Sequence, residues 1–213
     1  MRHKPYSLLS ALLCAFALGV HFSPEVHRTF DGPGQKKAPE TVLPPALHAP
    51  KPGAVEVRFS PDGGCTQTIV SAIRQAKTSI HLQAYSFTSA PIADALIQAH
   101  QKGVQIGVIL DKSHRSERSS VAPRLHSAGI PLWIDPRHAI AHNKVIVVDR
   151  ERVLTGSFNF TKAAEGSNAE NLLSIRDPAL ASLYVQNWET HQSHSSPFIP
   201  EQAPMNQLPA ELR

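Results

Sequence analysis

Hydrophobic and polar residues alternate with two different periods between residues 54 and 192, which predicts a folded segment of strands and helices. Residues 104–110 form a nearly continuous apolar run, as in a strand that is covered on both faces. Residues 91–102 carry apolar side chains along one helical stripe and are followed by Gly103, the usual residue after a helix end. These patterns predict strands at residues 55–59, 79–85, 104–110, 131–134, 145–148, 152–155 and 171–175, and helices at residues 66–76, 91–102, 119–128 and 179–192.

The order of these elements predicts an α/β fold with a mixed sheet. Strands and helices alternate through the first part of the segment, which favours an α/β sandwich. The later strands, at residues 145–148 and 152–155, follow one another closely, so part of the sheet should be antiparallel. We therefore expect a single domain, in which helices flank a mixed β-sheet on both faces.

The segments on either side of this domain differ from it in composition. Residues 1–22 begin with a basic group and continue with an apolar run at residues 7–20, which is shorter than the ~20 residues of a membrane span. This pattern predicts a signal peptide with a cleavage site at Ala15-Phe16-Ala17, and an uncleaved N-terminal anchor is the alternative. Residues 23–53 are rich in proline and are interpreted as a linker, and residues 193–213 as a flexible C-terminal tail.

Charge and cysteine content exclude few classes of function. The 213 residues carry a formal net charge of +4, which is compatible with an anionic partner but does not require one. Cys14 lies in the apolar run, so its removal with a signal peptide would leave Cys65 alone and no internal disulfide. The stability of the domain should then come from its hydrophobic core.

A group of polar residues at fixed spacing stands out between residues 142 and 159. The pattern is HxKxxxxDxxxxxxGSxN, and its specified positions are His142, Lys144, Asp149, Gly156, Ser157 and Asn159. A histidine, a lysine and an asparagine that converge on one phosphate suggest phosphodiester chemistry without a metal. His142 and Lys144 are two residues apart at a strand start, so they should share one face, roughly 7 Å apart at the backbone. His100 and Lys102 have the same spacing without the rest of the pattern, so we interpret them as a solvated helix end.

This pattern resembles the motif of the phospholipase D superfamily, and every specified position matches. The neighbouring segments YSFTSAPI, GSFNFTKAAE and NAENLL are similar to the small, single-motif bacterial branch, the exported EDTA-resistant endonucleases. The resemblance covers most of residues 54–192. It implies a phospholipase D-like α/β sandwich and a phosphodiester hydrolase that needs no cofactor. It also implies export to the bacterial periplasm, or attachment to the inner membrane facing the periplasm if the N-terminal segment is uncleaved.

The resemblance also implies a role for each polar residue. His142 would be the nucleophile and form a covalent phosphohistidine. Lys144 and Asn159 would bind the non-bridging phosphate oxygens, and the Ser157 hydroxyl could assist them. Glu170 would orient the imidazole of His142, and the alternative for Glu170 is a surface charge before a strand.

Two further motif positions have less direct roles. Asp149 stays among the candidate catalytic residues as a motif member, but it is five residues after Lys144 and should face the opposite way on a regular strand. A structural role is therefore expected for it, either pairing with a nearby base or capping the turn at Arg150-Glu151. Gly156 would let the backbone approach the phosphate closely.

The mechanism requires a second histidine to protonate the leaving oxygen and later to activate water. The chain carries one motif, and single-motif relatives of this kind pair two subunits about a two-fold axis. The resemblance thus implies an obligate homodimer with one composite active site, in which the second group is His142 of the partner subunit. His138 and His114 compete for this role, but each is expected to be a surface residue.

A metal-dependent mechanism is the natural rival. The chain has no His-x-His, Asp-x-Asp or paired-cysteine spacing. His142, Asp149 and Glu170 could bind a cation in principle, but Lys144 beside them would oppose it. No metal ligands are therefore assigned, and activity in excess chelator is expected.

The substrate is less well defined than the chemistry. Basic residues follow the strand at residues 104–110 and could track a phosphate backbone, with Arg115 and Arg118 as the candidate contacts, although a solvated basic face is an equal alternative. Three functions remain open. The first is a sequence-nonspecific endonuclease on DNA or RNA, the second is a phospholipase D that releases head groups, and the third is a non-catalytic nucleic-acid-binding module.

Overall fold

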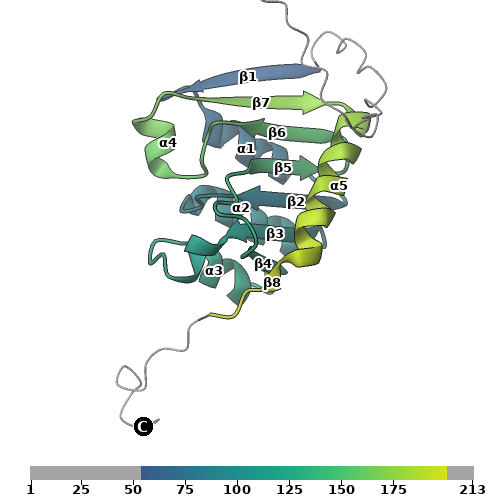
Figure 1. Ribbon diagram of the computed structural model, residues 1–213. Helices are drawn as coiled ribbons and strands as arrows, with labels where there is room; N and C mark the ends of the chain where they lie inside the picture. The colour runs from purple at the N-terminus through teal and green to yellow at the C-terminus, as the bar shows by residue number, and fades with distance from the viewer. Residues whose placement is uncertain (1–53, 201–213) are drawn as a thin grey trace, which may run out of the picture. The chain divides into compact units, whose positions relative to one another are not determined.

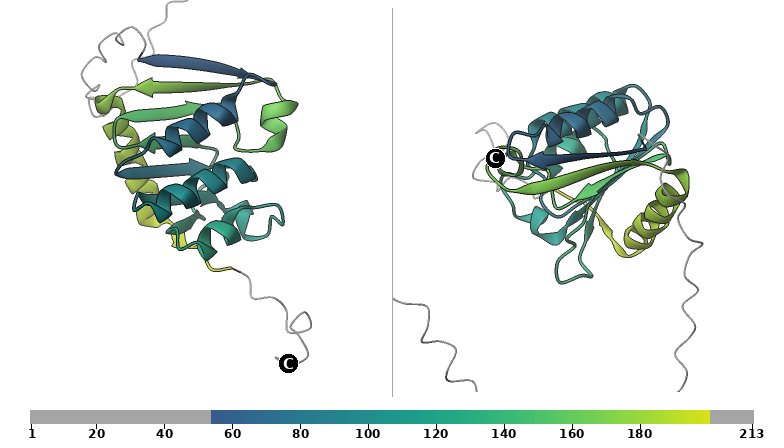
Figure 2. Two further views of the ribbon diagram at one scale, coloured as in Figure 1. Left: turned by 180° about the vertical axis from the view of Figure 1, so that it is seen from behind. Right: turned by 90° about the horizontal axis from the view of Figure 1, so that it is seen from above.

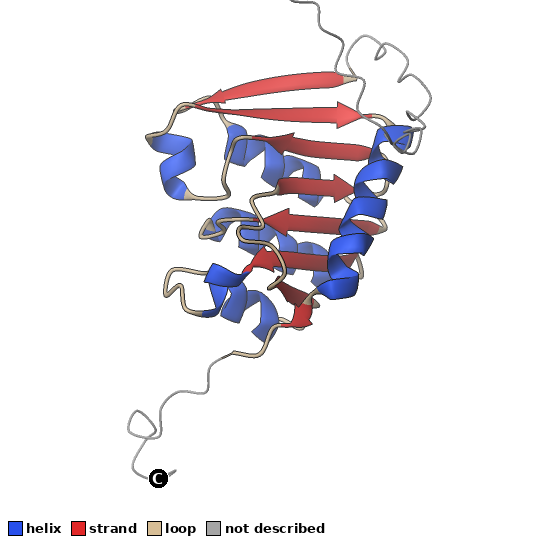
Figure 3. Cartoon of the chain, in the orientation of Figure 1, coloured by secondary structure: helices blue, strands red, loops and turns tan. Residues whose placement is uncertain are grey.

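The computed structural model describes residues 54–200, and this part of the chain forms a mixed β-sheet with helices on both faces (Figure 1). The strands are β1 (Val55–Ser60), β2 (Ser79–Ala84), β3 (Gln105–Asp111), β4 (Leu132–Asp135), β5 (Lys144–Val148), β6 (Arg152–Gly156), β7 (Glu170–Arg176) and β8 (Ser196–Pro197). The helices are α1 (Cys65–Arg74), α2 (Ala90–Gln101), α3 (Ala122–Ser127), α4 (Lys162–Gly166) and α5 (Pro178–His194), with a 3-10 turn η1 (Lys112–Arg115). Figure 3 separates these elements by colour, and the predicted α/β class is confirmed.

The eight strands follow the order β1-β7-β6-β5-β2-β3-β4-β8. β2, β3 and β4 run parallel, whereas β5, β6, β7 and β1 are joined by antiparallel pairs. Because β5 is antiparallel to β2, its first residue, Lys144, pairs with Ala84 at the end of β2. The ends of β2, β3, β4 and β6 therefore meet the starts of β5 and β7 at one end of the sheet, which we call the site end.

Two helical layers cover the sheet because its strands alternate apolar side chains between both faces. Helices α1, α2 and α3 lie on one face, and α5 crosses the other (Figure 2). Within β5, Ile146 belongs to the large core beneath α1 to α3. Val145 and Val147 instead pack against Ala181 and Val185 of α5. Each of these valine and isoleucine side chains stabilises the fold by about 1.5–3 kcal/mol when fully buried.

Several boundaries differ from the sequence predictions. Helix α3 begins at Ala122 rather than at residue 119, and the short helix α4 was not predicted because five residues show no helical period. Helix α5 continues to His194, and β8 then pairs with β4. The boundary at residue 192 was therefore wrong, since the start of the supposed tail completes the sheet and buries Phe198.

The predictions for residues 1–22 and 23–53, and for the last part of the tail, lie outside the described residues. None of the helices between residues 54 and 200 combines the length and the apolar character that crossing a bilayer requires.

Candidate active site

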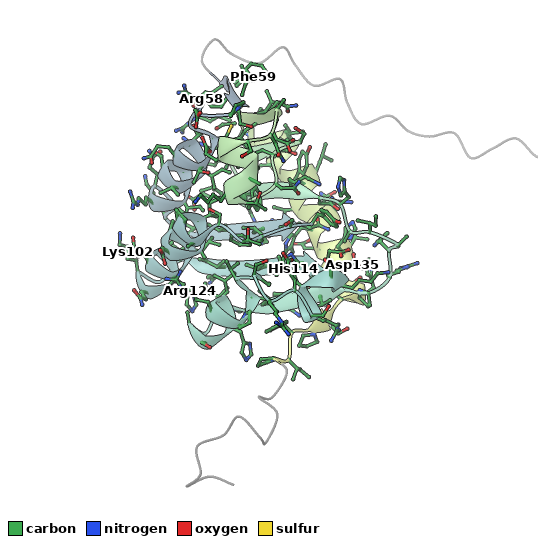
Figure 4. The ribbon with its side chains drawn as sticks, turned by 90° about the vertical axis from the view of Figure 1, so that its left-hand side faces the viewer. Arg58, Phe59, Lys102, His114, Arg124 and Asp135 are labelled. Atoms are coloured by element: carbon green, nitrogen blue, oxygen red, sulfur yellow. The ribbon has the colours of Figure 1, made fainter. Side chains whose placement is uncertain are left out.

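Buried ionisable side chains gather at the site end of the sheet. Among residues 54–200, the buried acids, histidines and lysines are Asp111, His114, Asp135 and Lys144, and all four lie at or just after strand ends there. Figure 4 looks onto this end, with His114 and Asp135 labelled. Burying an ionisable group costs free energy unless a partner compensates it, so such a concentration is typical of a functional site.

Lys144 is a buried cation without a carboxylate partner. Its side chain is 6% exposed, and its Nζ donates a hydrogen bond of 2.8 Å to the backbone oxygen of His142. The Nζ also lies 5.1 Å from the centre of the Tyr85 ring. No carboxylate in the described part of the chain forms an ion pair with it. Burial lowers the pKa of Lys144, and the charge of Glu170 partly opposes this. An anion bound beside Lys144 would supply the missing counter-charge.

His142 lies in the loop two residues before β5, which begins at Lys144, one residue earlier than the predicted strand. The residue is exposed, whereas Lys144 is buried beneath its backbone oxygen. The imidazole stacks at a tilt on Tyr85, with ring centres 4.6 Å apart. Tyr85 thus contacts both motif residues, and sequence reasoning missed it. The available signal was an aromatic residue at the end of an otherwise buried strand.

Gly156 permits a close approach between β6 and β7. Its φ is +155°, and a Cβ atom at this position would lie 2.2 Å from the backbone oxygen of Asn171. Any side chain here would push the two strands apart. The close approach that the structure shows at Gly156 is to the neighbouring strand, and its approach to a phosphate stays a prediction.

The loop after Gly156 carries Ser157 and Asn159 and runs beside the loop after β2. The Phe160 N–H donates to the backbone oxygen of Ser86 at 3.1 Å, and the Thr88 N–H donates to that of Phe160 at 2.9 Å. The two segments YSFTS and GSFNF thus form one unit at the site end. The side-chain oxygen of Asn159 is buried and has no hydrogen-bond partner among the described residues. This oxygen can accept a hydrogen bond from a ligand, whereas a contact from Asn159 to a phosphate oxygen would come from its NH₂ group, which donates.

Ser157 and Glu170 are tied to β7. The Ser157 hydroxyl accepts a hydrogen bond from the Asn171 N–H at 3.1 Å. Glu170 begins β7 and accepts a hydrogen bond from the Asn168 side chain at 3.2 Å. Glu170 makes no hydrogen bond to His142 of its own chain in the described region, so the expected orienting contact is not made there. The charge of Glu170 acts on Lys144 instead.

Asp149 lies at the opposite end of β5 and does not join this group. Its carboxylate accepts hydrogen bonds from the backbone N–H groups of Lys77, Thr78 and Ser79 and from the Thr78 hydroxyl, at 2.8 to 3.1 Å. Burial would raise its pKa, but these donors outweigh burial and hold the pKa below its ordinary value. The catalytic assignment of Asp149 was therefore wrong, and the structural role expected from its spacing takes the form of a cap on residues 77–79.

The basic residues divide into two groups. Arg115 and Arg118 are exposed on and after η1 at the site end, and the Arg115 guanidinium lies 3.5 Å from the Ser196 hydroxyl. Arg124 instead pairs with Asp94 in the helical layer, at the margin of Figure 4. Only the first group is placed where a substrate of the site could reach it.

The two competing histidines differ in exposure. His114 is 2% exposed, so the expectation of a surface position was wrong. Its Nε2 lies 2.9 Å from the backbone oxygen of Tyr85, and its Nδ1 lies 2.7 Å from the Ser120 hydroxyl. The buried His114 ring therefore helps to hold the Tyr85 loop in place. His138 is exposed, as expected, and its Nδ1 lies 2.9 Å from the Asp135 Oδ2.

A possible metal-binding group occurs elsewhere than the motif. Within residues 54–200, the ligand atoms of Asp135, His138, His191 and His194 lie within 4.8 Å of one another. Neither His142 nor Asp149 nor Glu170 belongs to such a group. Sequence reasoning missed this cluster because residue 194 was assigned to the tail. The signal was the spacing of His191 and His194, which puts both on one face if the helix continues.

Comparison with known proteins identifies the family. The family model "Cardiolipin synthase, PLD-like domain" matches residues 69–191. A "Phospholipase D" of Rickettsia typhi is 43% identical over 67% of this chain and 70% of its own length. A "Mitochondrial cardiolipin hydrolase" of Xenopus tropicalis is 30% identical over 77% of this chain and 79% of its own length.

A solved structure agrees with this relationship. The phospholipase D family member Nuc of Salmonella typhimurium superposes with a TM-score of 0.65 and 41% identity, covering 68% of this chain and 97% of that one. NucT of Helicobacter pylori, at 20% identity and a TM-score of 0.62, shares the fold. The motif, the sheet and these comparisons together show that the chain belongs to the phospholipase D superfamily.

Proposed function

We propose that the chain is a metal-independent phosphodiesterase that acts as a sequence-nonspecific endonuclease on DNA, with RNA as a second substrate. The observation that carries this proposal is the buried ammonium of Lys144, which forms no ion pair with a carboxylate of residues 54–200 and donates to the backbone oxygen of His142, whose imidazole is on an exposed residue. Such an arrangement suits an anion that binds between a nucleophile and a fixed positive charge.

The reaction proceeds in two displacements at phosphorus. His142 attacks, the bond to the leaving oxygen breaks, and a second histidine gives that oxygen a proton. Water, deprotonated by the same histidine, then attacks the phosphohistidine, frees His142 and leaves the phosphate on the other product. Lys144 and the Asn159 amide stabilise the negative charge on the non-bridging oxygens in both steps.

The second histidine in this proposal is His142 of the partner subunit. Two exposed apolar residues support an interface at the site end: Ile140 is 56% exposed two residues before His142, and Phe59 is 63% exposed near the end of β1. We expect the wild-type chain to be a dimer in solution. The variant Ile140→Asp should be a monomer without turnover. Co-refolding equal amounts of wild-type chain and His142→Asn should leave about one quarter of the activity, because only wild-type pairs carry both histidines. Retention of about one half would mean independent sites in each chain.

Nucleic acid is favoured because the exposed Arg115 and Arg118 follow β3 at the same end of the sheet. Contacts of this kind bind the phosphate backbone and do not read base edges, which is why little sequence preference is expected.

The central test is incubation of the full chain with plasmid DNA in excess EDTA. The wild type should convert supercoiled plasmid to nicked and linear forms, and His142→Asn should bind DNA with turnover reduced by at least ~10³-fold. His126→Asn is the matched control, since His126 is an exposed histidine on α3. Loss of wild-type cleavage in EDTA, or retained cleavage by His142→Asn, would contradict the proposal.

A phospholipase D activity is the second candidate, because relatives named "Phospholipase D" and "Mitochondrial cardiolipin hydrolase" share the domain. A parallel assay with DNA, phosphatidylcholine and cardiolipin vesicles separates the two. Preference for a lipid would replace the nuclease proposal while keeping the same chemistry. Binding of DNA without cleavage of any substrate would instead identify a non-catalytic module.

Export to the periplasm remains a proposal that rests on residues 1–22 alone. N-terminal sequencing of the mature protein distinguishes a cleaved signal peptide from an anchor.

A further inference from the structure

We propose that Asp135, His138, His191 and His194 bind one divalent transition-metal ion, with zinc as the preferred ion. This site is separate from the catalytic residues, and its role is to fasten the loop that carries His142 to the end of α5. The four residues are called the metal cluster below.

The metal cluster joins three parts of the chain. Asp135 ends β4, His138 lies in the loop between β4 and β5, and His191 and His194 occupy the last turn of α5. The two helical residues are three apart and so share one face of the helix. From the Asp135 Oδ2, the distances are 2.9 Å to the His138 Nδ1, 2.9 Å to the His191 Nδ1 and 3.4 Å to the His194 Nε2.

These distances are close to those that a small ion requires. In a tetrahedral zinc site the ligand atoms lie about 2.0–2.1 Å from the ion and hence about 3.3 Å from one another. All four ligand atoms are within 4.8 Å of each other, so side-chain rotations alone would close the site. A carboxylate oxygen with three imidazole nitrogens is a donor set suited to zinc, copper or nickel, and unsuited to magnesium or calcium, which prefer oxygen ligands.

The surroundings of the metal cluster also favour an ion. The Asp135 side chain is fully buried, and those of His191 and His194 are 14% and 16% exposed. The Nδ1 of His194 is buried and has no hydrogen-bond partner in the described region, and the Nε2 of this ring contacts only the Asp135 carboxylate there. Three imidazole rings thus converge on the Asp135 Oδ2. The other oxygen of this carboxylate, Oδ1, accepts a hydrogen bond from the Arg137 N–H at 2.9 Å. That second contact orients the carboxylate as outer partners orient ligands in known metal sites.

The position of the metal cluster gives the ion a structural purpose. The loop from Pro136 to Asn143 ends in the segment that carries His142. Asp111 accepts the Ala141 N–H at 2.7 Å, and the Lys112 Nζ donates to the backbone oxygen of His138 at 3.1 Å. Both contacts hold the loop to β3 and η1. The His138 ring already packs on those of His191 and His194, with ring centres 4.9 and 5.4 Å apart. An ion would add direct bonds between this loop and α5, four residues before the nucleophile.

The test uses the full chain produced without a polyhistidine tag, because such a tag would itself bind metal. The protein is equilibrated separately with zinc chloride and magnesium chloride, freed of unbound ions, and analysed for metal by mass spectrometry. We expect about one zinc ion per chain and no magnesium. The double variant His191→Ala, His194→Ala should lose the zinc, whereas His126→Ala should keep it.

Thermal unfolding supplies a second readout that does not depend on measuring the metal content. Zinc at about 100-fold above its dissociation constant should raise the melting temperature of the EDTA-stripped wild type by roughly 5–10 °C, and should leave that of the double variant unchanged. Sub-stoichiometric zinc in the wild type with no thermal shift would overturn the proposal, as would equal zinc in the double variant. Stripped protein should still cleave DNA below its melting temperature. If stripping abolishes cleavage by folded protein while zinc binding is present, the metal-independent mechanism fails and the metal site stands.

Discussion

The two ends of strand β5 carry two charged residues of the same motif, and the fold treats them in opposite ways. Asp149, at one end, receives hydrogen bonds from three backbone N–H groups and a hydroxyl. Lys144, at the other end, is more deeply buried, donates one hydrogen bond to a backbone oxygen and has no acidic partner in the described region. The fold therefore satisfies one charge fully and leaves the other in need of an anion.

This difference indicates that Asp149 contributes to stability and Lys144 to binding or chemistry, although both belong to one motif. A charge that the fold compensates contributes to stability, while a buried charge without a counter-ion reduces stability and is retained for binding or chemistry. We therefore expect substitutions at Lys144 to lower turnover with little change in stability. Substitutions at Asp149 should lower stability with little change in turnover.

The largest effect is expected for Lys144→Met. Methionine keeps the length and the apolar stem but removes the charge, so kcat/KM for DNA should fall by about 10³-fold, or about 4 kcal/mol of transition-state stabilisation. The free energy of unfolding in urea should stay the same or rise by about 1 kcal/mol, because a buried unpaired charge is removed. Steady-state cleavage assays and urea titrations on the same preparation measure both quantities.

Lys102→Met is the matched control for this substitution. Lys102 stands two residues after a histidine, as Lys144 does, but it is exposed at the end of α2 (Figure 4). It should change neither turnover nor stability. A large loss of stability in Lys144→Met would mean that the ammonium is compensated after all, and the contrast between the two ends of β5 would then be wrong.

Many features of the site end could be predicted from the sequence, because they depend on local sequence patterns. The strands were predicted from apolar runs. The segments GSFNF and YSFTS, which contain Asn159 and Tyr85, were singled out by their resemblance to a known family, and the structure shows that they contact one another. Period-two geometry also separated Asp149 from Lys144 correctly. These features depend on residues that are neighbours in the chain.

The remaining features depend on contacts between distant residues and left little trace in the sequence. His114 was expected at the surface because its neighbours are polar, yet its ring is buried against the Tyr85 loop. The last residues of α5 were assigned to a tail because prolines follow, although Asp135 and β4 hold them in place. The sequence does not show that Asp135, at the end of β4, has histidine partners, because those partners lie on α5 and reach it only in the folded chain.

An intermediate effect is expected for Asp149→Ala. Removing the carboxylate leaves the N–H groups of residues 77–79 without their acceptor, which should lower the free energy of unfolding by about 2–3 kcal/mol and the melting temperature by roughly 5–10 °C. Cleavage by the protein that remains folded should be unchanged within about twofold, because this end of β5 is remote from His142.

The control for Asp149→Ala must account for backbone conformation. Asp149 has a φ of +55°, and alanine is less favourable than aspartate in this left-handed region. Asp62 has a φ of +59°, so Asp62→Ala carries the same backbone cost without the loss of a cap. If the two variants lose equal stability, the hydrogen bonds of Asp149 contribute nothing measurable.

The smallest effect concerns the pH dependence of the same cap. The pKa of Asp149 is lowered in the folded chain, because the N–H groups of Thr78, Ser79 and Lys77 outweigh the opposing effect of burial. A group with a lowered folded pKa stabilises the fold above its unfolded pKa of about 3.9, and this contribution is lost as the pH falls through the folded value. Asp149→Asn removes the charge and keeps one acceptor oxygen, but it replaces the other, which accepts the Lys77 N–H at 3.0 Å, by an NH₂ group that donates. Its stability deficit against the wild type, measured by urea unfolding, should therefore be constant from about pH 7 to pH 5 and shrink below about pH 4. A deficit that stays constant down to about pH 2.5 would show that the cap at this end of β5 does not depend on an ionised carboxylate.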